Sequence, residues 1–587
     1  MEVTRTNFRK VLPEIEDTIN RCVFMAIDGE FTGLSSGLEK AVSAFDTPAE
    51  YYHKIRNGSL DFLLVQFGLV AFMYNDQEKK YTHKAYNFYL FPKPLSRQAP
   101  DCRFLCQASS LDFLASHGFN FNKLFNEGIP YLNKKDETTM RTKLDEARER
   151  RKSIGEKNNS FVECPPEHVD TVKKAVDSIT EFLSTTHGPI ELTLPPTNGF
   201  IRKLIYQEVW KRYSTDDLRV ETKNGIMVVK RPATAEEKAE EDKKKLEDEE
   251  SELDEAIGFS NVIRLISHSR KLVVGHNMLL DLCHVLHRFC QPLPDSYQEF
   301  KELLHTVFPY ILDTKFMCSI RPLNEAVPSS VLSHLLATVS QQPFQLLKVE
   351  PEGEHAYSTL EEKEHEAGFD AYITGTIAIA LSNYLAKSKK VKSAMKLPSA
   401  TSPHLGSVIN RLYLMKVIDS YIDLEKDDPE QNRDAVFHVT FPEEWKLSDL
   451  TSMFSPYGGV YVSWIDSRTA YCGLHDKTQA VNVMKQLVPS VPTGVTVATY
   501  YAVHKLGTAS PVKRRSGGEE NGNRPKRKHS LSQESSLKRP SVDPIPEESE
   551  DSEKDTQTKE RPQKKRKLSK SPTEDTRQKL FEENLDW

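Results

Sequence analysis

The chain has 587 residues, a net charge of −6 and 38% hydrophobic residues. This length exceeds one ordinary domain and predicts about three or four modules with enough apolar content for a sizeable core. No apolar run reaches the roughly 18 residues of a membrane span, and the first residues lack the apolar centre of a signal peptide. The eight cysteines show no CxxC pair, so we expect reduced thiols in an intracellular protein rather than disulfides or a zinc site.

The first part of the chain has an α/β pattern. An amphipathic stretch, Phe8–Ile19, predicts a helix, and the short apolar run Cys22–Ile27 predicts a buried strand. Further strands are expected at Asp61–Phe72 and Tyr86–Phe91. Residues 134–160 are highly charged and predict an exposed helix or a linker.

Residues 166–233 carry a second α/β pattern, with helices expected at Val169–Leu183 and Gly199–Tyr213. The mixed-charge run 236–255 predicts a solvated helix or a loop. The first pattern then resumes, with an expected strand and two helices at Lys271–Val274, Asn277–Phe289 and Ala367–Leu385. Residues 166–255 therefore look inserted into one larger domain.

A separate small unit is expected at 430–505, because short strand and helix patterns alternate there in the order β-α-β-β-α with one more strand candidate. These segments are Val436–Phe441, Leu447–Phe454, Gly459–Ile465, Ala470–Leu474, Thr478–Leu487 and Val495–Tyr501. From about Gly507 the chain is rich in Ser, Pro, Glu, Lys and Arg and poor in apolar residues, a composition typical of disorder.

Two carboxylates, Asp28 and Glu30, follow the first buried strand. Residues i and i+2 of a strand point to the same face, so the two acids would converge and repel one another. A divalent cation is the usual compensation, and hard oxygen ligands suit Mg²⁺ or Mn²⁺. A lone DxE pair is also common in surface turns, so this motif needs partners elsewhere in the chain.

A second motif places Asp281 among Leu279, Leu280 and Leu282, after a strand and a turn at Gly275. We expect a helix that holds Asn277 and Asp281 on one face, four residues apart. An acid in so apolar a stretch is either a helix cap or a metal ligand, and its surroundings alone do not decide between them.

A third motif contains His365 and Asp370. Asp370 shares a helical stripe with Ile373 and Ile377, where an unpartnered carboxylate would be costly to bury. His365 lies about 140° away on a continuous helix and reaches the same site only if the chain departs from the helix, which Gly368 would allow. An exposed or purely structural histidine is the alternative.

These three motifs, in this order on an α/β chain, resemble the DEDD superfamily of 3′ exonucleases. The pattern is Asp28-x-Glu30, Asn277-x₃-Asp281 and His365-x₄-Asp370, and its last spacing is that of the DEDDh branch. The blocks DFLLVQFGL, NFYLFPKP, GHNMLLD, LDTKFMCS and HEAGFDAYITG further resemble the poly(A)-specific ribonucleases, over roughly residues 1–505. The resemblance implies an α/β RNase H-like nuclease domain with a mixed sheet.

It also implies an inserted small α/β domain of the Arg-x₃-His nucleic-acid-binding type, an RRM-like α+β domain and a disordered tail. The expected boundaries are 1–165 and 256–395 for the two nuclease parts, 166–235 for the insertion, 236–255 and 396–429 for linkers, 430–505 for the RRM-like domain and 506–587 for the tail.

The site residues follow from the same resemblance. Asp28, Glu30, Asp281 and Asp370 would hold two Mg²⁺ ions, with Mn²⁺ as an alternative, and His365 would be the general base. Shortening of an mRNA poly(A) tail from its 3′ end would release 5′-AMP. Lys315 would contact a phosphate or base, with an ordinary surface lysine as the alternative. Phe31 and Phe113 would stack on adenines, or else pack in the core.

The accessory units depart from their families in places. The inserted unit has Arg202-x₃-Tyr206, with tyrosine where the family has histidine. The histidine contact is therefore lost, which weakens the expectation that this unit binds RNA. The RRM-like unit has Phe437 and Phe441 on its first strand but no aromatic-Gly-aromatic spacing on its third, which disfavours ordinary RRM recognition. Resemblance implies that Trp464 stacks on the 7-methylguanosine cap; a core tryptophan is the alternative.

The tail carries the basic clusters 513–515, 524–528 and 564–567, which favour nuclear import, so we expect the nucleus as well as the cytoplasm. Resemblance also implies a homodimer, and no membrane association is expected. Two other functions stay open. One is a DEDDh nuclease for other RNA 3′ ends, for structured RNA or for DNA. The other is a non-catalytic protein that binds cap and poly(A).

Overall fold

The computed structural model describes Met1–Gly507 except 36–41, 96–98, 154–161, 186–189, 215–216, 224, 232–234, 354–356, 360–362 and 392–398. The predicted tail and its basic clusters therefore lie outside the described residues. Within the described part, no helix has the length and hydropathy needed to cross a membrane. All eight cysteines are free thiols, of which four are buried.

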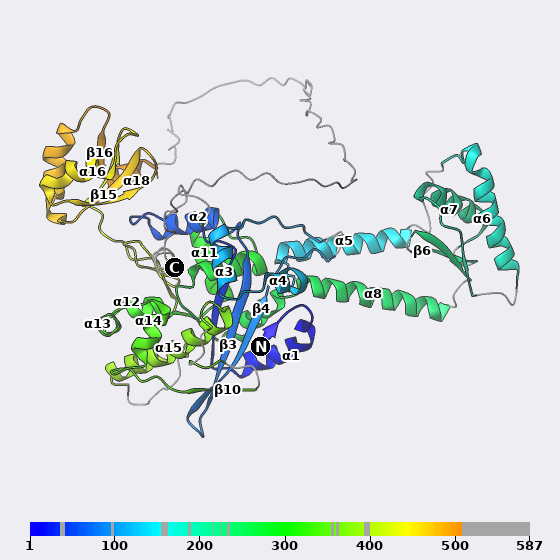
Figure 1. Ribbon diagram of the computed structural model, residues 1–587, viewed down its shortest axis with the longest axis horizontal. Helices are drawn as coiled ribbons and strands as arrows, with labels where there is room; N and C mark the ends of the chain where they lie inside the picture. Colours follow the sequence, from blue (N-terminus) through cyan, green and yellow to red (C-terminus); the bar gives the residue numbers. More distant parts are fainter. Residues whose placement is uncertain are drawn as a thin grey trace, which may run out of the picture. The chain divides into compact units, whose positions relative to one another are not determined.

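A seven-stranded mixed sheet forms the centre of the nuclease part (Figure 1). Six strands follow the order β1-β4-β3-β2-β8-β9, and β10 also pairs with β4. The pairs β2/β3 and β3/β4 are antiparallel, whereas the other pairs are parallel. The strands are β1 (Glu2–Val3), β2 (Phe24–Phe31), β3 (Leu64–Asn75), β4 (Lys80–Tyr89), β8 (Leu272–Gly275), β9 (Ile311–Asp313) and β10 (Val349–Pro351). The predicted mixed sheet is confirmed.

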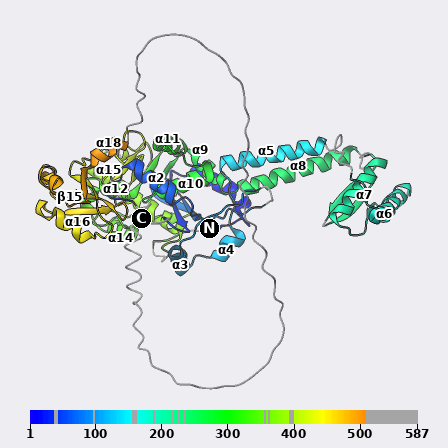
Figure 2. The same cartoon turned by 90° about the horizontal axis from the view of Figure 1, so that it is seen from above.

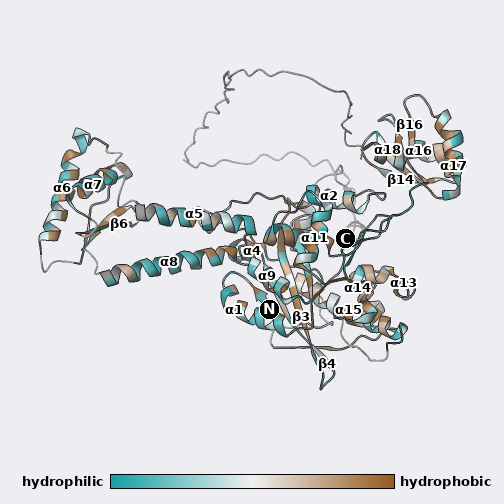
Figure 3. Ribbon diagram, turned by 180° about the vertical axis from the view of Figure 1, so that it is seen from behind, coloured by the Kyte–Doolittle hydropathy of each residue, from teal (hydrophilic) through white to brown (hydrophobic). Residues whose placement is uncertain are grey.

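Side-chain alternation divides the core between the two faces of this sheet. Met25 and Ile27 of β2 pack in one cluster, whereas Phe24 and Ala26 pack in the other. Strand β3 is buried on both faces over most of its length, which explains its nearly continuous apolar sequence (brown in Figure 3).

Helices contribute to both clusters. On the Met25 face these are α1 (Phe8–Arg21), α2 (Pro48–Gly58), α9 (Ser260–Ser269), α10 (Leu279–Val285), the π-helical turn η2 (Leu286–Cys290) and α11 (Tyr297–Val307). On the Phe24 face they are α12 (Thr314–Ser319), α13 (Leu323–Ala326), α14 (Leu332–Val339) and α15 (Ala367–Ser388). Further elements are α3 (Ala108–Ser116), α4 (Phe121–Glu127), η3 (Pro403–Leu405), β11 (Arg411–Tyr413) and β12 (Tyr421–Asp423).

The two charged stretches form a pair of helices, α5 (Lys134–Ser153) and α8 (Ala235–Ile257). They lie side by side in two perpendicular views (Figures 1 and 2) and are joined by ion pairs of Arg148 with Glu249 and Glu250. Between them the chain forms a unit with its own core and a sheet of order β5-β7-β6. Its elements are α6 (Pro166–Ser184), β5 (Glu191–Thr193), α7 (Gly199–Arg212), β6 (Arg219–Lys223) and β7 (Ile226–Lys230).

The C-terminal α/β unit has the predicted order of elements. They are β13 (Val436–Thr440), α16 (Leu447–Phe454), η4 (Ser455–Tyr457), β14 (Val460–Trp464), β15 (Thr469–Leu474), η5 (Lys477–Gln479), α17 (Ala480–Asn482), η6 (Val483–Leu487), η7 (Val488–Ser490) and β16 (Thr496–Thr499). Helix α18 (Tyr500–Gly507) follows, where part of a strand was expected. Phe437 and Phe441 are core residues of this unit.

The opposite face of β14 and β15 is in contact with the loop before α2. The ring of Phe45 lies edge-on to Tyr461 and Tyr471, at 6.0 and 6.1 Å between centroids. Its edge lies 2.4 Å from the place where a Cβ on Gly473 would be. Ser43 and Ser463 are hydrogen-bonded at 2.9 Å. The chain itself therefore covers part of the sheet face that carries the two tyrosines, and Tyr461 stays 53% exposed.

Gly68 of β3 provides a test of how α15 is seated. A Cβ there would lie 2.0 Å from the carbonyl oxygen of Ala367, the first residue of α15. Because that oxygen belongs to the backbone, Gly68→Ala should push the helix away and destabilise the protein by about 2–4 kcal/mol. Gly406→Ala is the control, since its Cβ would meet nothing closer than 3.7 Å. Denaturant unfolding measures both; equal midpoints for the two variants would contradict this packing.

Candidate metal and catalytic site

Strand β2 carries Asp28 and Glu30 toward α15. They continue the row of Phe24 and Ala26, which faces the cluster that contains α15. The strand extends through both acids instead of ending at Ile27, because Asp28 pairs with Gly68 and Glu30 with Gln66 of β3.

Asp281 reaches this strand from the first turn of α10. A Cβ on Gly29 would lie 2.9 Å from Oδ1 of Asp281 and 2.6 Å from Leu64. Only a glycine therefore lets the Asp281 carboxylate approach the backbone between Asp28 and Glu30. Asp281 does not cap α10, because the N-cap residue is Met278 and no side chain makes a capping hydrogen bond.

The expectation that Asn277 shares a helix face with Asp281 is wrong. Helix α10 begins at Leu279, and Asn277 lies before it in the left-handed region, with φ +58°. Its backbone N–H donates to Oδ1 of Asp313 at 2.9 Å. Asparagine tolerates this conformation better than most residues, which explains its place in the turn.

Asp313 is a residue that the sequence analysis missed. It is fully buried and accepts backbone N–H groups of Asn277, Lys315, Phe316 and Tyr413, at 2.9 to 3.4 Å. It thereby ties the turn before α10 to the start of α12. The signal was present, because an acid before a short apolar helix is typical of an N-cap.

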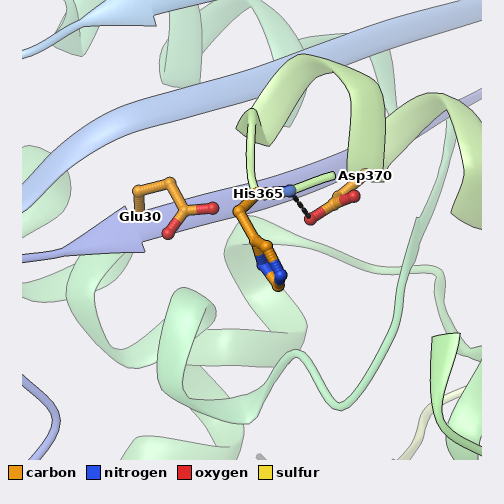
Figure 4. A group of neighbouring side chains, drawn as sticks. All are labelled: Glu30, His365 and Asp370. Carbon is orange, nitrogen blue, oxygen red and sulfur yellow. Dashed lines mark hydrogen bonds between the residues drawn. The ribbon is translucent and has the colours of Figure 1, made fainter. Parts of the chain in front are cut away.

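Asp370 and His365 meet Glu30 at the start of α15. One ligand atom from each of the three residues lies within 4.8 Å of the other two, and Figure 4 shows the side chains from β2 and α15 side by side. The helix begins at Ala367, and His365 precedes it with φ +68°. The departure from helix thus occurs at His365 itself, whose N–H donates to Oδ2 of Asp370 at 3.1 Å.

Polar side chains of β3 and β4 anchor this end of α15. Gln66 accepts the N–H of Ala367 at 3.0 Å, and Asn87 accepts that of Gly368 at 3.2 Å. Asn87 also donates to Glu366 at 2.9 Å. These bonds satisfy amide groups that the first turn of a helix leaves without partners. Gln66 and Asn87 were not predicted, although each is a polar residue in a buried strand.

Burial raises the pKa of every acid in the carboxylate cluster, which we define as Asp28, Glu30, Asp281 and Asp370. Burial raises the pKa of Asp28 and of Glu30 well above their usual range, and the charges of the neighbouring acids raise both further. Burial raises the pKa of Asp281 and of Asp370 to about 7.

No lysine or arginine forms an ion pair with the carboxylate cluster within the described part of the chain. A buried carboxylate needs a partner of opposite charge, and a group of neighbouring carboxylate oxygens suits Mg²⁺ or Mn²⁺. The residues present therefore fit a divalent cation.

His365 lies between aromatic rings and the acids. Phe113 and His117 of the α3 region contact its ring edge-on, at 4.6 and 4.5 Å between centroids. Burial, with a smaller effect of His117, lowers the pKa of His365 to about 4. Its imidazole is therefore neutral at pH 7. His117 was not predicted, since nothing in its sequence surroundings connects it to His365.

The remaining predicted contacts are placed as follows. Lys315 is 6% exposed, with its ammonium group 5.9 Å from the ring centre of Tyr413, so the surface alternative is wrong. Phe31 is 9% exposed, and its ring lies 4.7 Å from that of His284. Trp464 is 43% exposed and lies edge-on to Phe441 at the end of β14, so a buried core position is excluded.

In the inserted unit, both motif residues have intramolecular partners. Arg202 donates to the carbonyls of Thr197 and Gly225. The hydroxyl of Tyr206 is hydrogen-bonded to that of Thr222 at 3.1 Å, and its ring packs against the unit's core. Stacking of Tyr206 on a base would require this arrangement to open.

The sequence matches two family models. The CAF1 family ribonuclease model matches residues 3–378, and an RNA binding domain model matches residues 426–505. The poly(A)-specific ribonucleases PARN of Xenopus laevis and Homo sapiens are 41% and 42% identical; each alignment covers 83% of this chain, and 79% and 78% of those proteins.

More distant relatives were also found. The pre-piRNA 3′-exonuclease trimmer of Bombyx mori is 28% identical, over 80% of this chain and 88% of that protein. The structure of S. pombe Pop2p with Mg²⁺ and Mn²⁺ bound covers 70% of this chain and 98% of its own, with 13% identity and a TM-score of 0.33. Because the CAF1 model covers more than half of the sequence, the chain belongs to the CAF1 ribonuclease family.

Proposed function

We propose that this protein is a 3′-to-5′ exoribonuclease that shortens poly(A) tails and releases 5′-AMP. The main support for this proposal is that ligand atoms of Glu30, His365 and Asp370 lie within 4.8 Å of one another. The carboxylate of Asp281 lies beside Gly29, next to them. Family membership and about 42% identity to poly(A)-specific ribonucleases support the substrate. Retention of all four acids argues against a non-catalytic binding protein.

The carboxylate cluster would hold two divalent cations, Mg²⁺ or Mn²⁺. Bound there, they would supply Lewis-acid stabilisation of the scissile phosphate and a lower pKa for the attacking water. Asp281 and Asp370 would ionise on binding, since repulsion and burial keep their pKa near 7 in the free protein.

The chain's own side chains would orient the RNA and move the proton. Neutral His365 would accept the proton of the attacking water through a ring nitrogen. Phe113, whose ring contacts that of His365, would stack on the last base. Lys315 would supply positive charge for a phosphate, and Phe31 would form an apolar floor against His284.

A 5′-labelled RNA that ends in oligo(A) tests this function. With Mg²⁺ we expect a ladder that shortens from the 3′ end and 5′-AMP as the product. Asp281→Asn should lower the rate at least about a thousandfold while RNA binding persists, because a metal ligand and not the fold is lost. Equal cutting of a 3′-phosphate-blocked RNA would indicate an endonuclease and refute the proposal.

A second candidate is trimming of other RNA 3′ ends, favoured by the likeness to the Bombyx mori trimmer. The same assay separates the two. RNAs that end in oligo(A) and in mixed sequence should differ strongly in rate for a deadenylase, and similarly fast trimming of both would favour the second candidate.

Cation binding should release protons in a pH-dependent manner. Below pH 7 Asp281 and Asp370 carry protons in the free protein, and a metal ligand must be ionised. The number of protons that Mn²⁺ binding releases should therefore be larger at a pH near 6 than at a pH above 8, because Asp281 and Asp370 are already ionised at the higher pH. Calorimetry in buffers of different ionisation enthalpy measures this number. The same proton release at both pH values would contradict the raised pKa values.

We further propose that Trp464 binds the 7-methylguanosine cap. Its exposed ring suits a cationic purine, and Phe45 contacts both tyrosines on the other face of the same sheet. We also propose, from the resemblance, that the inserted unit binds RNA and that two chains form a homodimer. We further propose that the protein is present in both the nucleus and the cytoplasm.

Trp464→Ala should weaken cap binding at least about tenfold, since cation–π stacking on a desolvated ring contributes about 2 kcal/mol. Hydrolysis of uncapped oligo(A) should be unchanged. Trp210→Ala is the matched control, because Trp210 is 40% exposed in the inserted unit. Fluorescence polarisation of a labelled cap analogue measures both, and equal affinities for the two variants would exclude Trp464 as the cap site.

A further inference from the structure

A cavity of about 80 Å³ lies between the start of α5, the end of α8 and the turn η2. It is lined by the loop after β4 and by Tyr131, Leu132, Asn133, Asp136, Ala256, His287 and Arg288. Arg288 is seven residues beyond Asp281, or about 10 Å along a continuous helix. None of these lining residues has a part in the proposed hydrolysis.

Two buried donors of this lining have no acceptor among the described residues. They are the hydroxyl of Tyr131, a residue 8% exposed, and Nε of Arg288. The other guanidinium nitrogens are engaged, since Nη2 donates to the carbonyls of Leu60 and Phe62 at 2.5 and 3.0 Å, and Nη1 lies 3.7 Å from Sγ of Cys102. Leaving a buried donor unsatisfied costs about 1–3 kcal/mol.

The charge of Arg288 is also uncompensated, because it forms no ion pair within the described part of the chain. The lining also contains one carboxylate, Asp136, which accepts the amide of Asn133 at 2.9 Å, and one ammonium group, Lys93, whose charge offsets that of Asp136. His287 adds a third donor. Its Nδ1 accepts the N–H of Leu293 at 3.4 Å, which leaves the proton of the neutral ring on Nε2.

We propose that this cavity binds a phosphate-sized oxyanion between Arg288 and Tyr131. Donors without acceptors and a guanidinium without a counter-charge select an anion, and a tetrahedral oxyanion accepts from several directions at once. Water alone could satisfy the donors but would leave the charge unbalanced. At about 80 Å³ the cavity admits a phosphate group but no nucleoside, so the ligand is free phosphate or the phosphate end of a nucleotide.

Equilibrium dialysis of radiolabelled inorganic phosphate against the full-length protein in EDTA tests this site. EDTA removes cations that would bind phosphate at the carboxylate cluster. We expect one phosphate per chain. Tyr131→Phe should weaken its binding about tenfold, the loss of one hydrogen bond to a charged group. Tyr461→Phe is the control, because that tyrosine is exposed on β14.

Stability separates a binding defect from a folding defect. Without phosphate, Tyr131→Phe should keep or raise the unfolding midpoint, since it removes only an unpartnered hydroxyl. Added phosphate should then stabilise the unchanged protein more than this variant. Displacement of the label by 5′-AMP would identify a nucleotide phosphate as ligand; displacement by sulfate alone would identify a free oxyanion. No binding, or equal binding to Tyr131→Phe, would overturn the proposal in favour of a water-filled cavity.

Discussion

Repulsion among four carboxylates is the constraint on which the rest of this site depends. The fold brings Asp28, Glu30, Asp281 and Asp370 together with no lysine or arginine paired to them in the described chain. The sheet resists this repulsion through backbone contacts: Gly29 lets Asp281 approach, and Gly68 lets α15 lie directly on β3. Ionised carboxylates are therefore unfavourable in the free site, and the proposed divalent cations would offset their charge.

For three of the four acids, simple periodicity predicts the face on which they lie, whereas the grouping of all four rested on resemblance to a family. Asp28 and Glu30 share a strand face, and Asp370 falls on the buried stripe of a long apolar helix. The position of His365 could not be predicted in this way. It depends on a left-handed backbone angle at a non-glycine residue, and tertiary contacts of Asp370 and Gln66 hold that turn. The role of Asp313 in holding the turn before α10 likewise depends on hydrogen-bond partners 36 and 100 residues away in the chain.

The accessory units show a different limit of prediction. The order of elements in residues 430–505 followed from alternating patterns, and the helix Leu447–Phe454 is confirmed. The contact on one face of that sheet could not be predicted, because it is made by Phe45 and Ser43, about 400 residues earlier in the chain. Contacts between segments so distant have no local signal in a single sequence. Strand β14 has two exposed aromatic residues, Tyr461 and Trp464. Trp464 lies outside the contact with Phe45 and is therefore the one we propose for a ligand.

The central claim is that the carboxylate cluster is a cation site, and the stoichiometry of Mn²⁺ binding tests it most directly. Electron paramagnetic resonance of the full-length protein should count two Mn²⁺ ions per chain at a pH above 8. Asp281→Asn should lose at least one of them without a change in the fold. Absence of bound Mn²⁺ in the unchanged protein, or full occupancy in the variant, would contradict the account.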